Sequence, residues 1–343
     1  MEEKYPYGGQ AVIEGVMMRG PDQLAVAVRL PEGGLALDLK PVGSITKRIK
    51  PLNWPLIRGC VVLVESLIMG VGALSYSANQ AMGEEEELTT KELVLTIGFA
   101  FGLAILLFAV LPTAAAHYLN RIASDPLVSN LIEGVLRIVI FLVYVVAISQ
   151  MPDIKRVFQY HGAEHKVINA YEAGDPLTAE NVQRHSVAHP RCGTSFILIV
   201  LVLSILVFSL LGQQVLWWRI LSRVLLLPVI AGISYELLKL SGKYYNVPWC
   251  RFLIAPGMWV QRLTTREPDD SQVEVAIAAL EAVRKDHEGI ETETAETTEA
   301  VAAQAPEAAD APEVADTLET PEAAETPETP EDAADERVTE VAS

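Results

Sequence analysis

LVLTIGFAFGLAILLFAVLPT, residues 93–113, decides the fold class of this chain, because it contains no charged side chain. A helix of about 20 such residues is long enough to cross the hydrocarbon core of a bilayer. A helix on the surface of a soluble protein would instead carry a polar face at a spacing of 3.6 residues, and this run has none. The stretch therefore predicts a transmembrane helix.

Three further runs are long and mainly apolar. They are LIEGVLRIVIFLVYVVAISQ (131–150), TSFILIVLVLSILVFSLLG (194–212) and RILSRVLLLPVIAGISYELL (219–238). All are rich in Leu, Ile and Val and are close to the length that a bilayer requires. The predicted fold class is a membrane α-helical bundle with four transmembrane helices.

A fifth stretch, residues 57–75, is less apolar, since it contains Arg58, Glu65 and several glycines. We interpret it as an amphipathic or re-entrant helix against the bundle, with a fifth span as the alternative. The basic residues favour four spans, because they then share one side of the membrane: Lys47, Arg48, Lys50, Arg58, Lys155, Arg156, Lys166, Arg184, Arg191, Lys239, Lys243 and Arg251. The positive-inside rule makes that side cytoplasmic and predicts a multi-pass protein of the cell membrane with both termini cytoplasmic.

The remaining segments complete the predicted organisation. Residues 1–50 form a small β-rich cytoplasmic unit with strands at 23–30 and 35–40, and the weaker helix with an acidic loop occupies 51–92. The bundle covers 93–266 and includes a loop at 151–193. An amphipathic helix follows at 267–287, with a capping box of Ser271 and Glu274. Residues 288–343, rich in Ala, Glu, Thr and Pro, are predicted to be disordered.

Charge and cysteine content narrow the class of protein. Residues 267–343 carry 24 of the 44 acidic residues but only three of the 26 basic ones, so the acidic character belongs to the tail. The chain has no basic patch with interleaved aromatic residues, which argues against nucleic acid as a partner. Three distant cysteines without a CxxC pair argue against a disulfide framework, and the first residues do not resemble a cleaved signal peptide.

The stretch MPDIKRVFQYHGAEHKVINAYEAGDP, residues 151–176, predicts a helix between Asp153 and Gly174. At 100° per residue, His161, His165 and Glu172 lie on the face that Ile154 and Ile168 also occupy, while Glu164 lies at its edge. Ionisable groups on a face that should contact protein need partners, because burying them alone costs several kcal/mol.

A transition metal would supply that partner. Two histidines at i and i+4 can bind one ion, and HGAEH matches the H-x-x-E-H pattern in which the glutamate activates water. His189 and Cys192 precede the third apolar run and offer two more ligands. We therefore predict a divalent transition metal, Zn by its ligand types, held by His161, His165, His189, Cys192 and Glu172. The alternative is a hydrogen-bonded cluster of interfacial histidines without a metal.

Two apolar runs also carry charged residues. Glu133 and Arg137 are spaced i, i+4 and are interpreted first as an ion pair and second as part of a polar path. Glu236 and Lys239 have a similar position near the end of the last run.

Four motifs in this order resemble the YqhQ-like family of bacterial membrane proteins: GGQAVIEGVMMRGP, YHGAEHKVINAYE, HPRCGTSF and LTTREPDDSQVEVAIAAL. The resemblance extends from about residue 5 to residue 285 and leaves the acidic tail outside. It implies a membrane protein of the kind described as a predicted metal-dependent enzyme, with His161, Glu164, His165, His189 and Cys192 as its candidate site residues. The soluble peptidases with H-x-x-E-H take a distant glutamate as third ligand, so we do not carry their activity over.

Three functions remain open. The first is a metal-dependent hydrolase at the cytoplasmic membrane face, with Glu164 as catalytic base, Arg191 holding an anionic group, and a lipid-linked or membrane-embedded substrate. The second is a non-catalytic membrane scaffold or assembly factor, in which His161, His165, His189 and Cys192 close a structural site. The third is a transporter, which is disfavoured because the spans show no internal repeat.

Overall fold

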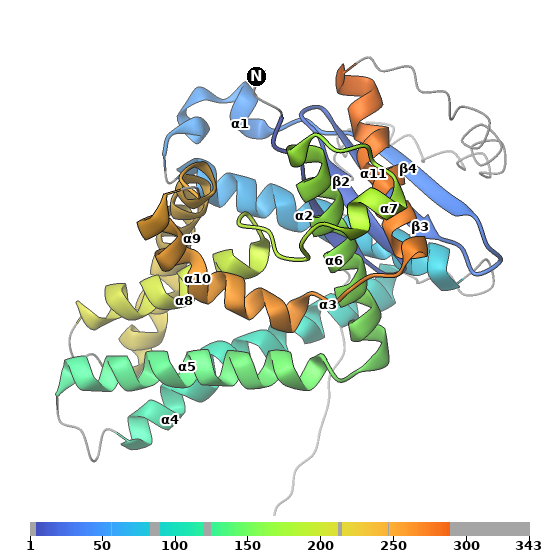
Figure 1. Cartoon of the computed structure of the whole chain (residues 1–343). Coiled ribbons are helices and arrows are strands. Elements are labelled where there is room, and N and C mark those ends of the chain that lie inside the picture. Colours follow the sequence, from blue (N-terminus) through green and yellow to red (C-terminus); the bar gives the residue numbers. More distant parts are fainter. Residues whose placement is uncertain are drawn as a thin grey trace, which may run out of the picture. The chain divides into compact units, whose positions relative to one another are not determined.

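The computed structural model describes residues 5–55, 57–82, 90–119, 125–211, 215–245 and 247–288 (Figure 1). The predicted disordered tail lies outside these residues from 289 onward, as does most of the predicted acidic loop before residue 90. The strands are β1 (Gly8–Val12), β2 (Gly15–Arg19), β3 (Gln23–Arg29) and β4 (Leu35–Pro41). The helices are α1 (Ile45–Arg48), η1 (Lys50–Asn53), α2 (Ile57–Met82), α3 (Thr90–Ile105), η2 (Leu106–Val110), α4 (Leu111–Leu119), α5 (Pro126–Ile148), α6 (Pro152–Ala173), α7 (Ala179–Gln183), α8 (Gly193–Ser209), α9 (Leu216–Lys243), α10 (Pro248–Thr264) and α11 (Asp270–Glu288).

The N-terminal residues form an antiparallel sheet in the order β1-β2-β3-β4. The two strands predicted around the turn at residues 31–34 are present as β3 and β4. β1 and β2 were not predicted as strands, because the stretch that forms them was notable only for its glycines. Their two-residue turn places Glu14 at a φ of 50°, and the Glu14 carboxylate pairs with Arg156 near the start of α6. The hairpin is thereby tied to the helix that carries the histidines.

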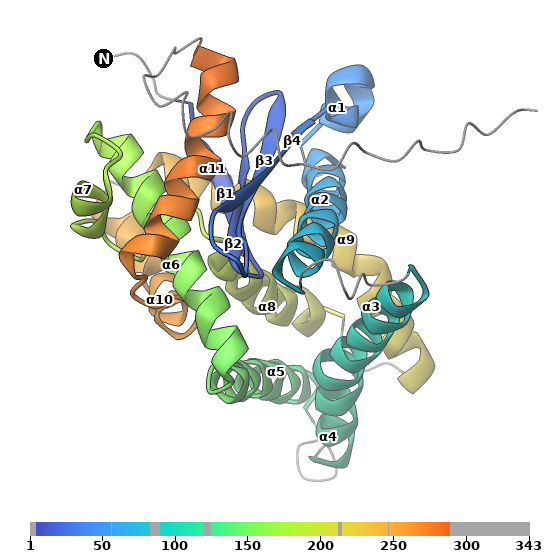
Figure 2. The ribbon, with the colours of Figure 1, turned by 90° about the vertical axis from the view of Figure 1, so that its right-hand side faces the viewer.

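Helices cover both faces of this sheet (Figure 2). On one face Val16, Met18, Ala25 and Ala27 pack with residues of α6 and α11 in the largest apolar cluster. On the other face a second cluster includes Val26 of β3 and extends to α2. Because both faces are buried, the inner strands β2 and β3 are apolar at nearly every position. The β-rich unit therefore shares its core with helices from the middle and the end of the chain.

The weak apolar stretch at 57–75 is part of α2, a continuous helix of 26 residues, which has the length that the alternative of a fifth span requires. One side of α2 contacts the sheet: Ser77 Oγ accepts a hydrogen bond from the Ile13 amide at 3.1 Å, and Glu65 accepts one from Ser44. The opposite side exposes apolar residues such as Val64 and Ile68. At its start Gly59 lies so close to Gly232 of α9 that a Cβ would be 2.9 Å from the Gly232 Cα. The helix lies against α9 and the sheet.

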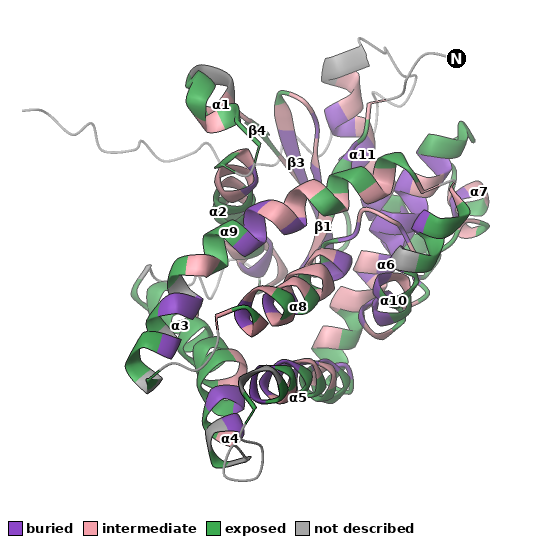
Figure 3. Cartoon of the chain, turned by 90° about the vertical axis from the view of Figure 1, so that its left-hand side faces the viewer, coloured by how far each residue is buried: buried purple, intermediate pink, exposed green. Residues whose placement is uncertain are grey.

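Four helices among the described residues are long and apolar enough to cross a membrane: Ile57–Met82, Val94–Ala116, Val128–Ile148 and Trp217–Lys243. Three correspond to predicted spans, and the first is α2. The predicted span at 194–212 is the apolar helix α8, which is shorter at 17 residues. The most apolar part of Val94–Ala116 contains no buried residue, and apolar side chains of α3, α5 and α9 are exposed (Figure 3).

The two helices that flank the sheet begin and end at local signals. α6 starts with Pro152 at its first position and stops at Gly174, which has a φ of 87°. The predicted capping box of α11, Ser271 with Glu274, is wrong, because the observed box lies two residues earlier. The Asp269 carboxylate accepts from the Gln272 amide at 2.9 Å, and the Gln272 side chain accepts from the Asp269 amide at 3.0 Å. Glu274 instead pairs with Arg29 of β3 at 3.2 Å.

Candidate metal centre

The two histidines of the HGAEH motif lie one turn apart in α6, with ring centroids 4.4 Å from each other. Between them Gly162 allows the segment after α10 to approach the helix, since a Cβ there would be 2.0 Å from the Arg266 carbonyl oxygen. The Arg266 amide also donates to the Phe158 carbonyl at 2.9 Å. A backbone segment distant in sequence is thus held against the histidine face of α6.

Backbone carbonyls fix the orientation of both imidazoles. His161 Nδ1 lies 2.8 Å from the Thr264 carbonyl oxygen, and His165 Nδ1 lies 2.6 Å from the Val187 carbonyl oxygen. A carbonyl can only accept, so both Nδ1 atoms carry hydrogen and donate. In the neutral rings each Nε2 then holds a lone pair, which is the arrangement that metal-binding histidines adopt.

Cys192 contributes a sulfur atom to the same point. It caps the N-terminus of α8 and accepts a hydrogen bond from the Thr194 amide at 3.4 Å. Its Sγ lies 3.3 Å from His161 Nε2. The side chain is buried, and cysteine sulfur is a common ligand of zinc.

His161, His165 and Cys192 are the described residues that could hold an ion together, with ligand atoms no more than 4.8 Å apart. Two atoms bound to one tetrahedral zinc ion are separated by about 3.3–3.8 Å, so the sulfur-to-nitrogen distance already fits and a small closure would complete the set. The position of Glu164 also favours a cation at this place. Glu164 Oε2 lies 3.5 Å from His165 Nε2, and a carboxylate repels the nitrogen lone pair unless a cation or a proton lies between the two atoms.

Glu164 is held in this position by the first strand. Its side chain is buried, and a Cβ on Gly9 of β1 would be 2.8 Å from Glu164 Cγ and 2.7 Å from the Met17 carbonyl oxygen. Any larger residue at position 9 would displace the carboxylate or the strand. Gly9 therefore serves the site as well as the sheet.

The other two predicted ligands, His189 and Glu172, contact each other next to the cluster of His161, His165 and Cys192. His189 Nδ1 accepts from the Arg191 amide, so its Nε2 carries hydrogen and donates to Glu172 Oε2 at 3.4 Å. Glu172 also pairs with the Arg191 guanidinium. Burial opposes ionisation of Glu172, but the His189 hydrogen bond and Arg191 outweigh it and lower the Glu172 pKa to about 2. The His189 ring lies 5.8 Å from the His165 ring.

Helix α10 supplies residues that were not predicted. Gln261 is fully buried, and its amide group donates to the His189 carbonyl at 2.9 Å and accepts from the His189 amide at 3.0 Å. Three residues later the Thr264 carbonyl orients His161. A buried glutamine and a backbone carbonyl leave no pattern in a single sequence, so neither could be identified before the structure.

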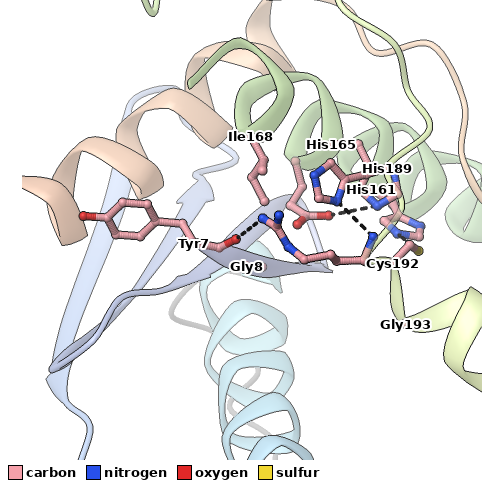
Figure 4. Close-up of a pocket in the computed structure, with 11 residues that line it drawn as sticks. Tyr7, Gly8, His161, His165, Ile168, His189, Cys192 and Gly193 are labelled. Carbon is pink, nitrogen blue, oxygen red and sulfur yellow. Dashed lines mark hydrogen bonds and ion pairs between the residues drawn. The ribbon is translucent and has the colours of Figure 1, made fainter. Parts of the chain in front are cut away.

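These side chains surround a cavity of about 100 Å³ (Figure 4). It is lined by His161, Glu164, His165 and Cys192 and, from the N-terminal segment, by Tyr7, Gly8 and Gly9. Arg191 spans the cavity and donates to the Tyr7 carbonyl at 3.3 Å. The room is sufficient for an ion with water or a small substrate group.

Comparisons with known proteins agree with this set of motifs. Residues 54–286 match the family model described as "Protein of unknown function (DUF1385)". The chain is 38% identical over 290 residues to "Uncharacterized protein YqhQ" of Bacillus subtilis (strain 168), covering 79% of this chain and 90% of that protein. No solved structure matches the chain. The chain therefore belongs to the YqhQ-like family that this model describes.

Proposed function

We propose that this chain is an integral membrane protein that acts as a metal-dependent hydrolase, with its site at the cytoplasmic face of the bacterial cell membrane. The observation that carries the proposal is the convergence of His161, His165 and Cys192 on one side of a cavity. Three protein ligands and an open position are typical of catalytic zinc sites, whereas structural sites are closed by four. His189 would be the fourth ligand of a closed site, but its ring forms a hydrogen bond with Glu172 instead.

The residues around the cavity have separate roles in this proposal. A bound divalent transition metal, Zn by its ligand types, would supply Lewis acidity and a nucleophilic water. The Glu164 carboxylate accepts the proton of the attacking water and passes it to the leaving group. Arg191 lines the cavity, and its guanidinium group suits an anionic group of the substrate.

The membrane placement is supported by the positions of the helix ends. The sheet, α6 and α11 share one core and so lie on one side of any membrane. Two apolar passes, α3–α4 and α5, lie between the sheet and α6 in the sequence, and two more, α8 and α9, lie between α6 and α11. Each pair of passes crosses the membrane and returns the chain to the side on which it started. In this arrangement α2 lies along the membrane surface, with its exposed apolar side toward lipid, and a lipid-linked substrate can reach the site.

The ion content of the purified full chain tests the metal centre. We expect about one ion per chain in the wild type, and loss of that ion in His161→Ala and Cys192→Ala. His185→Ala is the matched control, because His185 pairs with Asp175 at 2.9 Å and lies outside the cluster. Ion content that is unchanged in the two ligand variants would refute the metal centre.

A Glu164→Gln variant separates hydrolysis from a scaffold role. Gln has nearly the same shape but cannot take a proton, so we expect retained ion content and a loss of turnover of about 10²–10⁴-fold. Turnover is measured by mass spectrometry of phospholipids and lipid-linked esters incubated with the protein in vesicles. Equal turnover by wild type and variant would exclude Glu164 as the base, and no turnover by either would favour the scaffold.

A further inference from the structure

A second cluster of charged side chains lies between the apolar helices. Glu133 of α5 is its centre and is contacted by three arginines. Arg137 Nη2 donates to Glu133 Oε1 at 3.1 Å, and Arg219 Nη2 donates to Oε2 at 2.5 Å. Arg223 donates to both oxygens, at 2.7 and 2.8 Å. The predicted pair of Glu133 and Arg137 is confirmed as a salt bridge, but it is part of a larger set.

The charges of this set do not balance. Among the described residues, Glu133 is the acidic side chain that these three guanidinium groups contact, so the cluster carries a net charge of +2. Their other partners among the described residues are neutral: the side chains of Asn130 and Ser129, the Phe108 and Arg219 carbonyls, and the Phe208 ring. Two uncompensated positive charges between apolar helices are costly, because burial removes their hydration. An anion bound beside them would remove that cost.

The arginines retain the access that an anion needs. The side chain of Glu133 is 2% exposed, whereas those of Arg137, Arg219 and Arg223 are 10%, 11% and 10% exposed. The guanidinium groups therefore surround the carboxylate and present their outer edges to the surface. Within the described part of the chain, the hydrogen bonds of the Arg219 side chain all start from Nη2, and a guanidinium group has five N–H donors in total.

Arg219 and Arg223 lie in the first two turns of α9, whereas Arg137 lies at the middle of α5. Along α5, Glu133 precedes Ile148, next to α6, by a rise of about 22 Å. Arg219 is in the first turn of α9, within reach of the helix end. If these helices cross the membrane as proposed, Arg219 and Arg223 lie toward the headgroups of the opposite leaflet, where long cationic side chains extend toward phosphate.

We propose that Arg137, Arg219 and Arg223 form a binding site for a phosphate group. Guanidinium groups recognise phosphate through paired N–H donors, and a dianionic phosphate would match the excess charge. The group can belong to a phospholipid headgroup or to a soluble phosphate. The site rests on the arginine cluster and not on the metal centre, although the lipid source relies on the proposed membrane placement.

Two measurements on the full chain, purified in a maltoside detergent, distinguish the two sources. Native mass spectrometry compares retention of phosphatidylglycerol with retention of a galactolipid that has no phosphate. Thermal unfolding is followed as inorganic phosphate replaces chloride at constant ionic strength. We expect preferential retention of phosphatidylglycerol, a rise in melting temperature with inorganic phosphate, or both. Neither effect in the wild-type protein would overturn the proposal.

Variants identify the residues responsible. Arg219→Gln should reduce phosphate or phosphatidylglycerol binding at least tenfold, while Arg219→Lys should retain part of it. Arg58→Gln is the matched control, because Arg58 forms a balanced pair with Glu236 at 2.5 Å and should bind as the wild type does. Equal loss in Arg58→Gln and Arg219→Gln would contradict the proposal. Ion content measured in parallel should be unchanged in Arg219→Gln, and His161→Ala should retain phosphate binding. The proposals of the metal centre and of the phosphate site are thus tested independently.

Discussion

The chemistry of the candidate metal centre depends on which ring nitrogen of each histidine carries hydrogen. Hydrogen bonds from Nδ1 to the Thr264 and Val187 carbonyls direct both Nε2 lone pairs inward. The sequence identified His161, His165 and Cys192 as partners, because histidines at i and i+4 share a helix face and Cys192 lies beside a predicted helix end. It could not identify their carbonyl partners, since any residue provides a carbonyl.

Gly162 gives a test at the scale of one residue. In Gly162→Ala the new Cβ would be 2.0 Å from the Arg266 carbonyl oxygen, so the segment after α10 must move away from α6. We expect a loss of stability of about 1–3 kcal/mol, as for other overpacked sites, together with weaker metal binding because Thr264 moves with that segment. The melting temperature and the ion content of the purified protein measure the two effects.

Gly98→Ala is the control for that prediction. A Cβ at Gly98 of α3 has no neighbouring heavy atom within 4 Å, so the change should be neutral or stabilise the helix by up to about 1 kcal/mol. If Gly162→Ala behaves in the same way, the close approach of α6 and the 264–266 segment is not present in solution.

At the scale of single elements, helices with local signals were the most predictable. Pro152 and Gly174 mark the ends of α6, and the absence of charge marks Val94–Ala116. Elements that depend on distant partners were harder. β1 and β2 are stabilised by α6 and α11, which no local pattern reveals, and α2 combines a sheet-facing side with an apolar side exposed in the structure. The cap of α11 was misassigned because two overlapping segments both fit the pattern.

The observed cap of α11 predicts a dependence of stability on pH. Burial opposes ionisation of Asp269, but hydrogen bonds from Ser271 and Gln272 outweigh it and lower the Asp269 pKa. The ionised cap therefore stabilises the folded state at pH values above 3.8, which is the ordinary pKa of this carboxyl group. That stabilisation is lost as the pH falls through the lower pKa that Asp269 has in the folded state. We expect Asp269→Ala to lower the stability by about 1 kcal/mol at pH 7, measured by thermal unfolding.

Asp269→Asn provides the comparison for this cap. Asparagine caps a helix about as well as aspartate but does not titrate in this range. The variant should match the wild type at pH 7 and lack the contribution of this group to the loss of stability as the pH falls below 3.8. A capping role for Ser271 would instead make Ser271→Ala the more damaging change.

At the scale of the whole molecule, one core unites three distant parts of the chain. The N-terminal sheet, α6 and α11 pack together, while the apolar helices occupy the intervals between them. The sequence predicted the apolar helices from their composition, but not that the sheet, through Gly9, would form a wall of the histidine cavity. Hydropathy describes how a segment interacts with its solvent, whereas the assembly of these parts depends on contacts between segments.

This assembly brings two nitrogens from α6 and one sulfur from the start of α8 to a common point. X-ray absorption at the edge of the bound metal in the purified full chain tests that claim most directly. The account predicts two nitrogen ligands at about 2.0–2.1 Å and one sulfur ligand at about 2.3 Å, with the sulfur contribution lost in Cys192→Ser. A coordination shell of nitrogen and oxygen alone in the wild-type protein would contradict it.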